Sequence, residues 1–302
     1  MTIIDCITAF IAAKIAGNRR PTTIYHYRAR LGTFAAWLDA QGITEIDSLT
    51  PGSIRDYLSS RLHAGTQAST VSQERAIILS CLRWLVREGY VDEQKWEDRV
   101  DRVRVDTKEP RYLTADECKR LITTVDTRHR RYELTAKRDA AIVRMLLDTG
   151  MRLGELLRLR IEDVDMVGRA VYVSAAAKGR RDRTVWFGSD TLRALRGYMR
   201  VRSASVGIDS LWVSRVGSRL SDKELWYVVR RLAHEAGLSD VSVHTLRHTA
   251  ATLLLRNGMD VTRVQRILGY VNITMTMRYT HLMPDDLRAA HEHAAPVDRL
   301  YR

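Results

Sequence analysis

The first 90 residues contain four stretches in which apolar side chains recur at helical spacing, and the turns between them are short. Pro21 is placed to begin the second stretch and Gly42 to end it, because proline suits the first helical turn and glycine the position after the last one. Thr50 is a favourable N-cap for the third stretch, and Ser69 is expected to cap the fourth. Four short, closely connected helices bury their apolar faces by packing together, so this pattern predicts a small helical bundle. The predicted helices cover residues 3–15, 21–40 and 51–63, with the fourth following Ser69.

A charged segment between residues 91 and 111 interrupts this pattern. Beyond it, Thr114 is followed three residues later by Glu117, a spacing typical of the capping box at a helix start. Residues 170–174 and 183–187 are rich in β-branched and aromatic side chains, and a basic turn with a glycine separates them, which predicts a β-hairpin. The chain is therefore predicted to be mainly α, with a four-helix N-terminal domain and a mixed α+β second domain that holds a small antiparallel sheet. The expected domains are residues 1–105 and residues 113–302 with a C-terminal tail, joined by a linker at 106–112.

The chain is strongly basic, with a formal net charge of +13 and a pI of about 9.9. Residues 1–107 contain 14 lysines and arginines against 13 aspartates and glutamates, so nearly all of the excess lies in the second part. A field of this sign favours polyanionic partners, namely DNA, RNA or an anionic membrane surface. Charge alone does not separate a protein that binds nucleic acid from an enzyme that acts on it.

The sequence indicates neither a membrane span nor a secretory signal. No run of 18 apolar residues is present, and the N-terminal residues lack the basic and small-residue features of a secretory signal. The three cysteines, Cys6, Cys81 and Cys118, form no C-x-x-C pair, which is typical of reduced thiols in a cytoplasmic protein. We therefore expect a cytoplasmic protein without a membrane span.

The histidines of the second domain do not indicate a metal site. His244 and His248 are four residues apart and His281 follows later, but no glutamate lies within 244–248 to complete a metalloprotease helix. The chain also lacks a Gly-x-x-x-x-Gly-Lys-Ser/Thr loop and an acidic cluster suited to two-metal chemistry. We expect no metal and no cofactor.

Four segments of the second domain hold residues that are able to bind or attack a phosphate. Each alone has an ordinary structural explanation: a surface ion pair, a solvated loop, a polar helix face, or a core or interface tyrosine. Arg152 is expected at a helix start with Glu155 one turn later, and His244 and Arg247 at i and i+3 of another helix. The segments are Thr149–Leu156, the hairpin turn with Lys178, His244–His248, and Leu268–Tyr270 followed by Tyr279–His281.

Together and in this order, the segments resemble the motifs of the tyrosine recombinases, also called the phage integrase family. The family pattern is Arg, Lys, His-x-x-Arg, Leu-Gly followed by His or Trp, and finally Tyr. Segments 22–38 and 69–85 also resemble the core-binding domain of the family. The resemblance covers nearly the whole chain and implies a SAM-like core-binding domain followed by a catalytic domain, as in the two-domain, Xer-like members.

The resemblance implies a site-specific DNA recombinase or integrase that cuts and rejoins DNA through a 3′-phosphotyrosyl intermediate, without ATP or a metal ion. Tyr279 would attack the phosphodiester, although a phenol with a pKa of about 10 is a weak nucleophile unless nearby cations favour the phenolate. Arg152 and Arg247 would donate paired hydrogen bonds to the phosphate and stabilise the transition state. Lys178 would protonate the departing 5′-oxygen, and His244 would donate to the phosphate or accept the tyrosine proton.

Tyr270 departs from the family pattern, which has His or Trp at this position. Its hydroxyl can still donate a hydrogen bond, so we expect activity with an altered phosphate contact. Glu155 is expected to orient the site. Candidate DNA contacts, each of which could equally be a solvated charge, are Arg19, Arg20, Arg28, Arg30, Arg180 and Arg181.

The resemblance also implies double-stranded DNA as the partner, and a homo-tetramer acting on two DNA sites, with a monomer possible in the absence of DNA. A partner recombinase is possible. Two other functions stay open: DNA relaxation like that of a type IB topoisomerase, and DNA binding by a protein with a decayed site. No residue pattern identifies the target DNA sequence. None distinguishes integration, dimer resolution and transposon resolution either.

Overall fold

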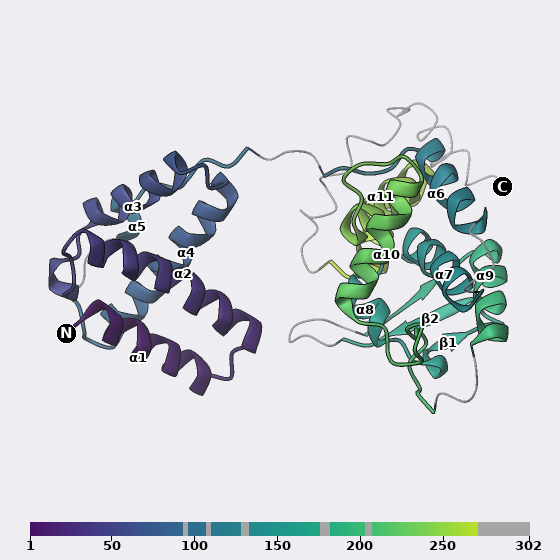
Figure 1. Cartoon of the computed structure of the whole chain (residues 1–302), viewed down its shortest axis with the longest axis horizontal. Helices are drawn as coiled ribbons and strands as arrows, with labels where there is room; N and C mark the ends of the chain where they lie inside the picture. The colour runs from purple at the N-terminus through teal and green to yellow at the C-terminus, as the bar shows by residue number, and fades with distance from the viewer. Residues whose placement is uncertain (93–95, 107–109, 128–132, 176–181, 203–206, 271–302) are drawn as a thin grey trace, which may run out of the picture. The chain divides into compact units, whose positions relative to one another are not determined.

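The structure is a computed structural model, and it describes residues 1–92, 96–106, 110–127, 133–175, 182–202 and 207–270 (Figure 1). The chain divides into two compact units, Met1–Lys108 and Glu109–Arg302, and each is described by itself. None of the described helices combines the length and the apolar character that a membrane span requires.

Unit 1 is a helical bundle, as the spacing of apolar residues predicts. Thr50 Oγ1 accepts a hydrogen bond from Ser53 N at 3.1 Å, which confirms Thr50 as the cap of the third helix. Ser69 is not the cap of the fourth helix: Gln67 has the non-helical backbone angles (φ −57°, ψ 136°), so Ser69 already lies in the first turn. The helices are α1 (Ile3–Ala16), α2 (Pro21–Ala40), α3 (Pro51–His63), α4 (Ala68–Arg87) and the short α5 (Trp96–Arg99), with a 3-10 turn, η1 (Ile46–Ser48).

The interior of unit 1 combines an apolar core with one buried carboxylate. Phe10, Leu38 and Ile54 are fully buried where the helices meet. Glu74 on α4 is equally buried, and its carboxylate accepts hydrogen bonds from Arg30 at 3.0 Å, Arg61 at 3.2 Å and the Tyr57 hydroxyl at 3.1 Å. Because a buried charge is costly without partners, these bonds account for an ionised residue in the bundle.

Unit 2 is mostly helical, with a small sheet. Thr114 N donates to Glu117 and Glu117 N donates to Thr114 Oγ1, which confirms the capping box. The sheet order is β1-β2-β3, all antiparallel, with Val171 opposite Val185. The strands β2 and β3 form the predicted hairpin, and the two-residue β1 was not predicted. The elements are α6 (Ala115–Thr127), α7 (Glu133–Thr149), α8 (Leu153–Arg158), η3 (Ile161–Asp163), β1 (Val164–Asp165), β2 (Ala170–Val173), β3 (Arg183–Trp186), α9 (Ser189–Val201), α10 (Asp222–Glu235), α11 (Val243–Arg256) and α12 (Val261–Leu268).

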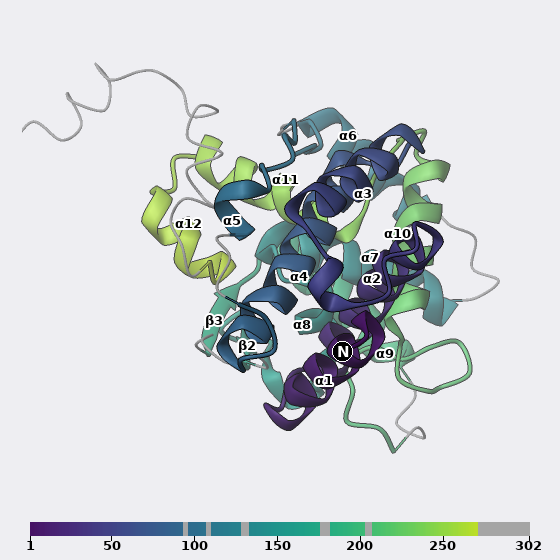
Figure 2. The ribbon, with the colours of Figure 1, turned by 90° about the vertical axis from the view of Figure 1, so that its left-hand side faces the viewer.

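The helix α7 is the centre of unit 2. It packs against α6, α9 and α11 (Figure 1), and Ala141, Ile142, Met145 and Leu146 on it are almost fully buried. The last helix, α12, lies against α11 and against β3 (Figure 2). Since α8 follows α7 after a turn at Gly150, this packing brings the start of α8, the start of β3, the first half of α11 and the end of α12 to one place.

Candidate active site

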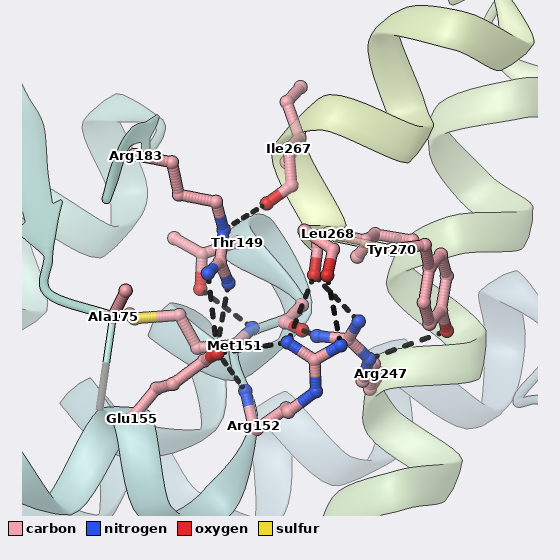
Figure 3. Close-up of polar contacts among 12 residues, drawn as sticks. Thr149, Met151, Arg152, Glu155, Ala175, Arg183, Arg247, Ile267, Leu268 and Tyr270 are labelled. Carbon is pink, nitrogen blue, oxygen red and sulfur yellow. Dashed lines mark hydrogen bonds and ion pairs between the residues drawn. The ribbon is translucent and has the colours of Figure 1, made fainter. Parts of the chain in front are cut away.

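Three arginines from three elements converge on the end of α12 (Figure 3). Arg152 is the N-cap of α8, Arg183 is the first residue of β3, and Arg247 lies on α11. All three donate to main-chain carbonyl oxygens within Ile267–Gly269. The end of α12 is a suitable acceptor because the last carbonyls of a helix lack partners within the helix and carry partial negative charge.

Arg152 and Glu155 occupy the first turn of α8, as predicted. The backbone N of Arg152 donates to Glu155 Oε2 at 2.9 Å, and Arg152 Nη1 donates to Glu155 Oε1 at 2.9 Å. The Arg152 guanidinium also reaches Gly269 O at 3.1 Å and Leu268 O at 3.4 Å. The carboxylate therefore holds the Arg152 guanidinium at the helix start.

Arg247 is the most deeply buried of the three arginines, with 3% of its surface exposed. Its Nη1 donates to Gly150 O at 2.6 Å and its Nη2 to Leu268 O at 2.7 Å. Leu268 O therefore bridges Arg152 and Arg247 and holds the two guanidinium groups near each other. Within the described residues these bonds leave N–H donors on both groups for an anion, since a guanidinium has five.

Tyr270 covers this pair of cations. Its ring centroid is 4.6 Å from Arg247 Cζ and 5.8 Å from Arg152 Cζ, which is within the range of cation–π attraction. The Arg247 Nε to Tyr270 Oη distance is 3.4 Å, a long hydrogen bond. The phenol group favours the charged state of Arg247, and its hydroxyl lies at the edge of the pair (Figure 3).

Two glycines allow the segments to approach so closely. Gly150 has φ +59°, and a Cβ there would lie 2.4 Å from Leu268 Cδ2. Gly269 has φ +64°, and a Cβ there would lie 2.9 Å from Arg183 Nη1. A side chain at either position would force Leu268 or the Arg183 guanidinium to shift, and the positive φ at both positions favours glycine in any case.

Arg183 was missed by the sequence analysis. Its Nη2 donates to Glu155 Oε2 at 2.8 Å, its Nη1 to Glu155 Oε1 at 3.2 Å and its Nε to Ile267 O at 2.7 Å. Residues alternate between the two faces of a strand, and Arg183 shares the inward face of β3 with the buried Val185. The sequence signal that could have identified Arg183 is a charged residue at a strand position that faces the interior.

The electrostatics of the site favour an anion. Burial alone would raise the pKa of Glu155, but hydrogen bonds from Arg183 and Arg152 lower it to about 2, so this residue is a carboxylate at any working pH. Burial, reinforced by the charge of Arg152, lowers the pKa of Arg247 from its usual value. Within the described residues, Arg152 and Arg183 pair with the Glu155 carboxylate, and the nearby charge of Arg247 is buried without a carboxylate partner.

His244 lies in the first turn of α11, one turn before Arg247. Unlike Arg247 it is exposed, and within the described residues no hydrogen bond joins it to the arginines. The remaining predicted site residues, Lys178, Arg180, Arg181 and Tyr279, lie outside the described residues.

The predicted DNA contacts of unit 1 differ among themselves. Arg19, Arg20 and Arg28 are exposed around the start of α2. Arg30 is only partly exposed and is ion-paired with Glu74, so its guanidinium already has a structural partner.

The described residues contain no cluster of metal-binding side chains, and their cysteines are buried. Groups of three or more His, Cys, Asp or Glu able to hold a metal are absent from them. The three cysteines are buried, and burial raises the pKa of each thiol, to about 12 for Cys81 and about 11 for Cys118. Such thiols are poor nucleophiles.

The chain thus combines a helical bundle with an α+β unit in which three arginines from three elements meet at the end of one helix. Residues 111–285 match the Phage integrase family, and residues 8–89 match the Phage integrase N-terminal SAM-like domain. The chain therefore belongs to the phage integrase family and is a tyrosine recombinase, an enzyme of site-specific DNA recombination.

Known proteins resemble the chain over nearly its full length. Tyrosine recombinase XerC of Oceanobacillus iheyensis is 29% identical, with 94% of this chain and 93% of that protein covered. Tyrosine recombinase XerD of Ralstonia nicotianae is 30% identical, with coverages of 91% and 88%. Among solved structures, XerA recombinase is 27% identical with a TM-score of 0.53, covering 97% of this chain and 98% of that one. The integrase of transposon Tn1549, in complex with a circular intermediate DNA, has the same fold: its TM-score is 0.79 at 20% identity, with coverages of 97% and 99%.

Proposed function

We propose that the chain binds duplex DNA and exchanges strands at specific sites by transesterification at the arginine pair Arg152–Arg247. The observation that supports this most directly is the shared acceptor Leu268 O, at 3.4 Å from Arg152 Nη1 and 2.7 Å from Arg247 Nη2. Two guanidinium groups held on one oxygen are spaced to hold the non-bridging oxygens of one phosphate. The single negative charge of Glu155 neutralises only part of the positive charge of the arginines. A bound phosphate would neutralise more of it.

The reaction proceeds in two transfers. The phenol oxygen of Tyr279 attacks phosphorus, the bond from phosphorus to the 5′-oxygen breaks, and Lys178 supplies the proton that the departing oxygen needs. The product is a 3′-phosphotyrosyl bond, which a 5′-hydroxyl of another strand attacks in the reverse sense. Arg152 and Arg247 stabilise the additional negative charge at phosphorus, and His244 donates to the phosphate or takes the proton of Tyr279.

Tyr270 takes the place at which the family has His or Trp. In our proposal its ring keeps the two arginines in position and its hydroxyl donates to a phosphate oxygen. The position is consistent with this role because the hydroxyl is already directed at the edge of the Arg247 guanidinium.

The assembly and the division of labour between domains are also part of the proposal. Residues 1–105 act as the core-binding domain, 106–112 as the linker and 113–302 as the catalytic domain, and together they hold duplex DNA. Four copies act on two sites in the cytoplasm, either alone or with a partner recombinase, while the free chain is a monomer. Backbone contacts from the exposed basic residues supply affinity without sequence information; the candidates are Arg19, Arg20, Arg28, Arg180 and Arg181.

Covalent trapping on a nicked duplex tests the chemistry. The nick lets the short leaving strand diffuse away, so the protein stays attached to DNA and migrates as an adduct in a denaturing gel. We expect an adduct with the wild-type chain and none with Tyr279→Phe. The matched control is Tyr270→Phe, which removes the other phenol oxygen of the region and is expected to slow adduct formation without abolishing it, because one phosphate contact is lost and the nucleophile is kept. An adduct that persists in Tyr279→Phe and disappears in Tyr270→Phe would reverse the assignment of the nucleophile.

Recombination between two sites on one plasmid tests strand exchange. DNA flanking the native gene, mapped by footprinting, provides the binding site. We expect a recombined product with both sites present; relaxation of supercoils with a single site and no recombinant would instead identify a topoisomerase-like reaction.

A further inference from the structure

Arg183 is the residue through which the sheet contacts the arginine pair. Its side chain is 12% exposed, and its three hydrogen bonds join the start of β3 to Glu155 on α8 and to Ile267 O at the end of α12. Figure 3 shows its guanidinium between the two, on the opposite side of Glu155 from Arg152.

The bonds of Arg183 differ from those of an ordinary surface ion pair. Two parallel N–H groups meet the two oxygens of Glu155, while the third donor is directed at a helix carbonyl, so all three bonds together fix the plane of the guanidinium. Gly269, at which a Cβ would lie 2.9 Å from Arg183 Nη1, leaves room for this geometry. The site is therefore built around Arg183 as closely as around Arg152.

Both targets of Arg183 in turn position the phosphate-binding arginines. Glu155 holds Arg152 Nη1 at 2.9 Å, and the residues after Ile267 present Leu268 O and Gly269 O to Arg152 and Arg247. Removal of the Arg183 guanidinium would take away two hydrogen bonds to the Glu155 carboxylate and the bond to Ile267 O, so Glu155 and the last turn of α12 would be held less firmly. A misplacement on the order of 1 Å at a reacting group is enough to reduce rates about 10²-fold.

We infer that Arg183 is a positioning residue of the strand-exchange reaction, which acts by holding Glu155 and the end of α12 so that Arg152 and Arg247 face one phosphate. This inference rests on the proposed function. It assigns Arg183 no contact with DNA.

The role has a pH signature that a purely structural residue would lack. Within the described residues the charged groups facing Glu155 are Arg152 from its own helix and Arg183 from β3, with Arg247 on α11 farther away. Without Arg183, burial acts on Glu155 with fewer opposing hydrogen bonds, so its pKa rises. A protonated Glu155 loses its charge-assisted bond to Arg152, and cleavage then falls as the pH is lowered.

The experiment compares Arg183→Gln with the wild-type chain in single-turnover adduct formation on the nicked duplex. We expect adduct formation to slow by about 10–100-fold, with DNA affinity in a gel-shift assay within about twofold of wild type, since no phosphate contact is lost. The ratio of variant to wild-type rates should fall further between about pH 8 and pH 5, the direction set by a raised carboxyl pKa. The double variant Glu155→Gln/Arg183→Gln should show a ratio that does not depend on pH.

Two further variants keep the outcome decisive. Arg219→Gln removes another guanidinium that joins two segments, through its bonds to Leu157 O, and is expected to leave the adduct rate unchanged. Arg183→Lys retains a positive charge near Glu155 and should recover part of the rate with a pH-independent ratio. If Arg183→Gln does not fold, the adduct rate of Arg183→Lys relative to wild type tests the positioning role instead.

Other outcomes would contradict the positioning role of Arg183. A rate of Arg183→Gln within about twofold of wild type, or a reduced rate with the same pH profile, overturns the positioning role. Failure of both Arg183 variants to fold would show that the residue is structural only. If the wild-type chain itself forms no adduct, the proposed function fails, which is a different result from a normal wild type with an unaffected variant.

Discussion

Among the described residues, each unit buries one glutamate that pairs with two arginines, and the two clusters differ in their surroundings. Glu74 in unit 1 is held by Arg30 and Arg61, whose side chains remain 32% and 27% exposed. Glu155 in unit 2 is held by Arg152 and Arg183, which are 21% and 12% exposed and which continue to the carbonyls at the end of α12.

The two clusters differ because a third arginine, Arg247, lies beside the cluster of unit 2. Within the described residues of unit 2, Arg247 is buried beside the Glu155 cluster and hydrogen-bonds to no carboxylate, only to carbonyl oxygens and Tyr270. In unit 1 the Tyr57 hydroxyl completes the shell of Glu74, and the pKa of Tyr57 is raised by burial and by Glu74, so this hydroxyl stays a donor. Both clusters contain more arginines than carboxylates, but Arg30 and Arg61 reach water, whereas the charge of Arg247 is buried. A bound anion is therefore expected to stabilise the cluster of unit 2 more than that of unit 1.

The largest expected effect is on the rate of adduct formation, which should depend on the arginines of unit 2 and not on those of unit 1. Arg247→Ala should slow adduct formation by about 10²–10³-fold, because a preorganised donor to the transition state is lost, while DNA affinity is largely kept. Single-turnover trapping and gel-shift assays measure the two quantities. Arg61→Ala in unit 1 is the matched control, and its adduct rate per folded molecule should stay close to wild type. Equal slowing by both substitutions would remove the distinction between the clusters.

The next effect is the pH dependence of stability that Glu155 confers. Its folded pKa of about 2 lies below the ordinary 4.5, so its stabilisation is complete above about pH 4.5 and is lost as the pH falls towards 2. The shift corresponds to about 3 kcal/mol. Thermal unfolding of wild type and Glu155→Gln should therefore differ most at neutral pH, and the difference should shrink with acidification. A difference that stays constant down to about pH 3 would mean that the carboxylate is not held as described.

A smaller effect is expected for the carboxylate of unit 1. Glu74→Gln leaves Arg30 and Arg61 without their anion, but both can turn partly to water, so the free energy of unfolding should fall by about 2 kcal/mol, less than for a fully buried pair. Hydrogen exchange resolved by peptide should show the loss in α3 and α4. We expect adduct formation by folded protein to be unaffected; slower chemistry here would show that Glu74 does more than stabilise the bundle.

The smallest effect compares glycines with the same backbone conformation in the two units. Gly65 has φ +79° and open space around its Cα, so Gly65→Ala should cost only the backbone strain, about 1 kcal/mol. Gly150→Ala adds a collision with Leu268, and both unfolding midpoint and adduct rate should suffer. If Gly150→Ala matches Gly65→Ala in both measurements, the close approach of α12 is not required.

Local chemistry in the sequence determined much of the architecture. The bundle helices, the Thr50 cap, the Thr114–Glu117 capping box and the β2–β3 hairpin depend on neighbouring residues, and all were predicted. The position of Arg152 at a helix start with Glu155 one turn later was predicted for the same reason. The cap at Ser69 failed because the backbone angles that end a helix depend on packing as well as on the preference of one side chain.

Tertiary structure alone decided which charges meet. Residues 155, 183 and 267 are far apart in sequence and carry no mutual spacing rule, so the bonds of Arg183 could not be predicted. The same holds for the ion pair between Arg30 and Glu74, which no spacing rule in the sequence indicates. Short-range order follows from each residue and its neighbours, whereas a buried ion cluster exists only where packing excludes water and fixes the distances between distant segments.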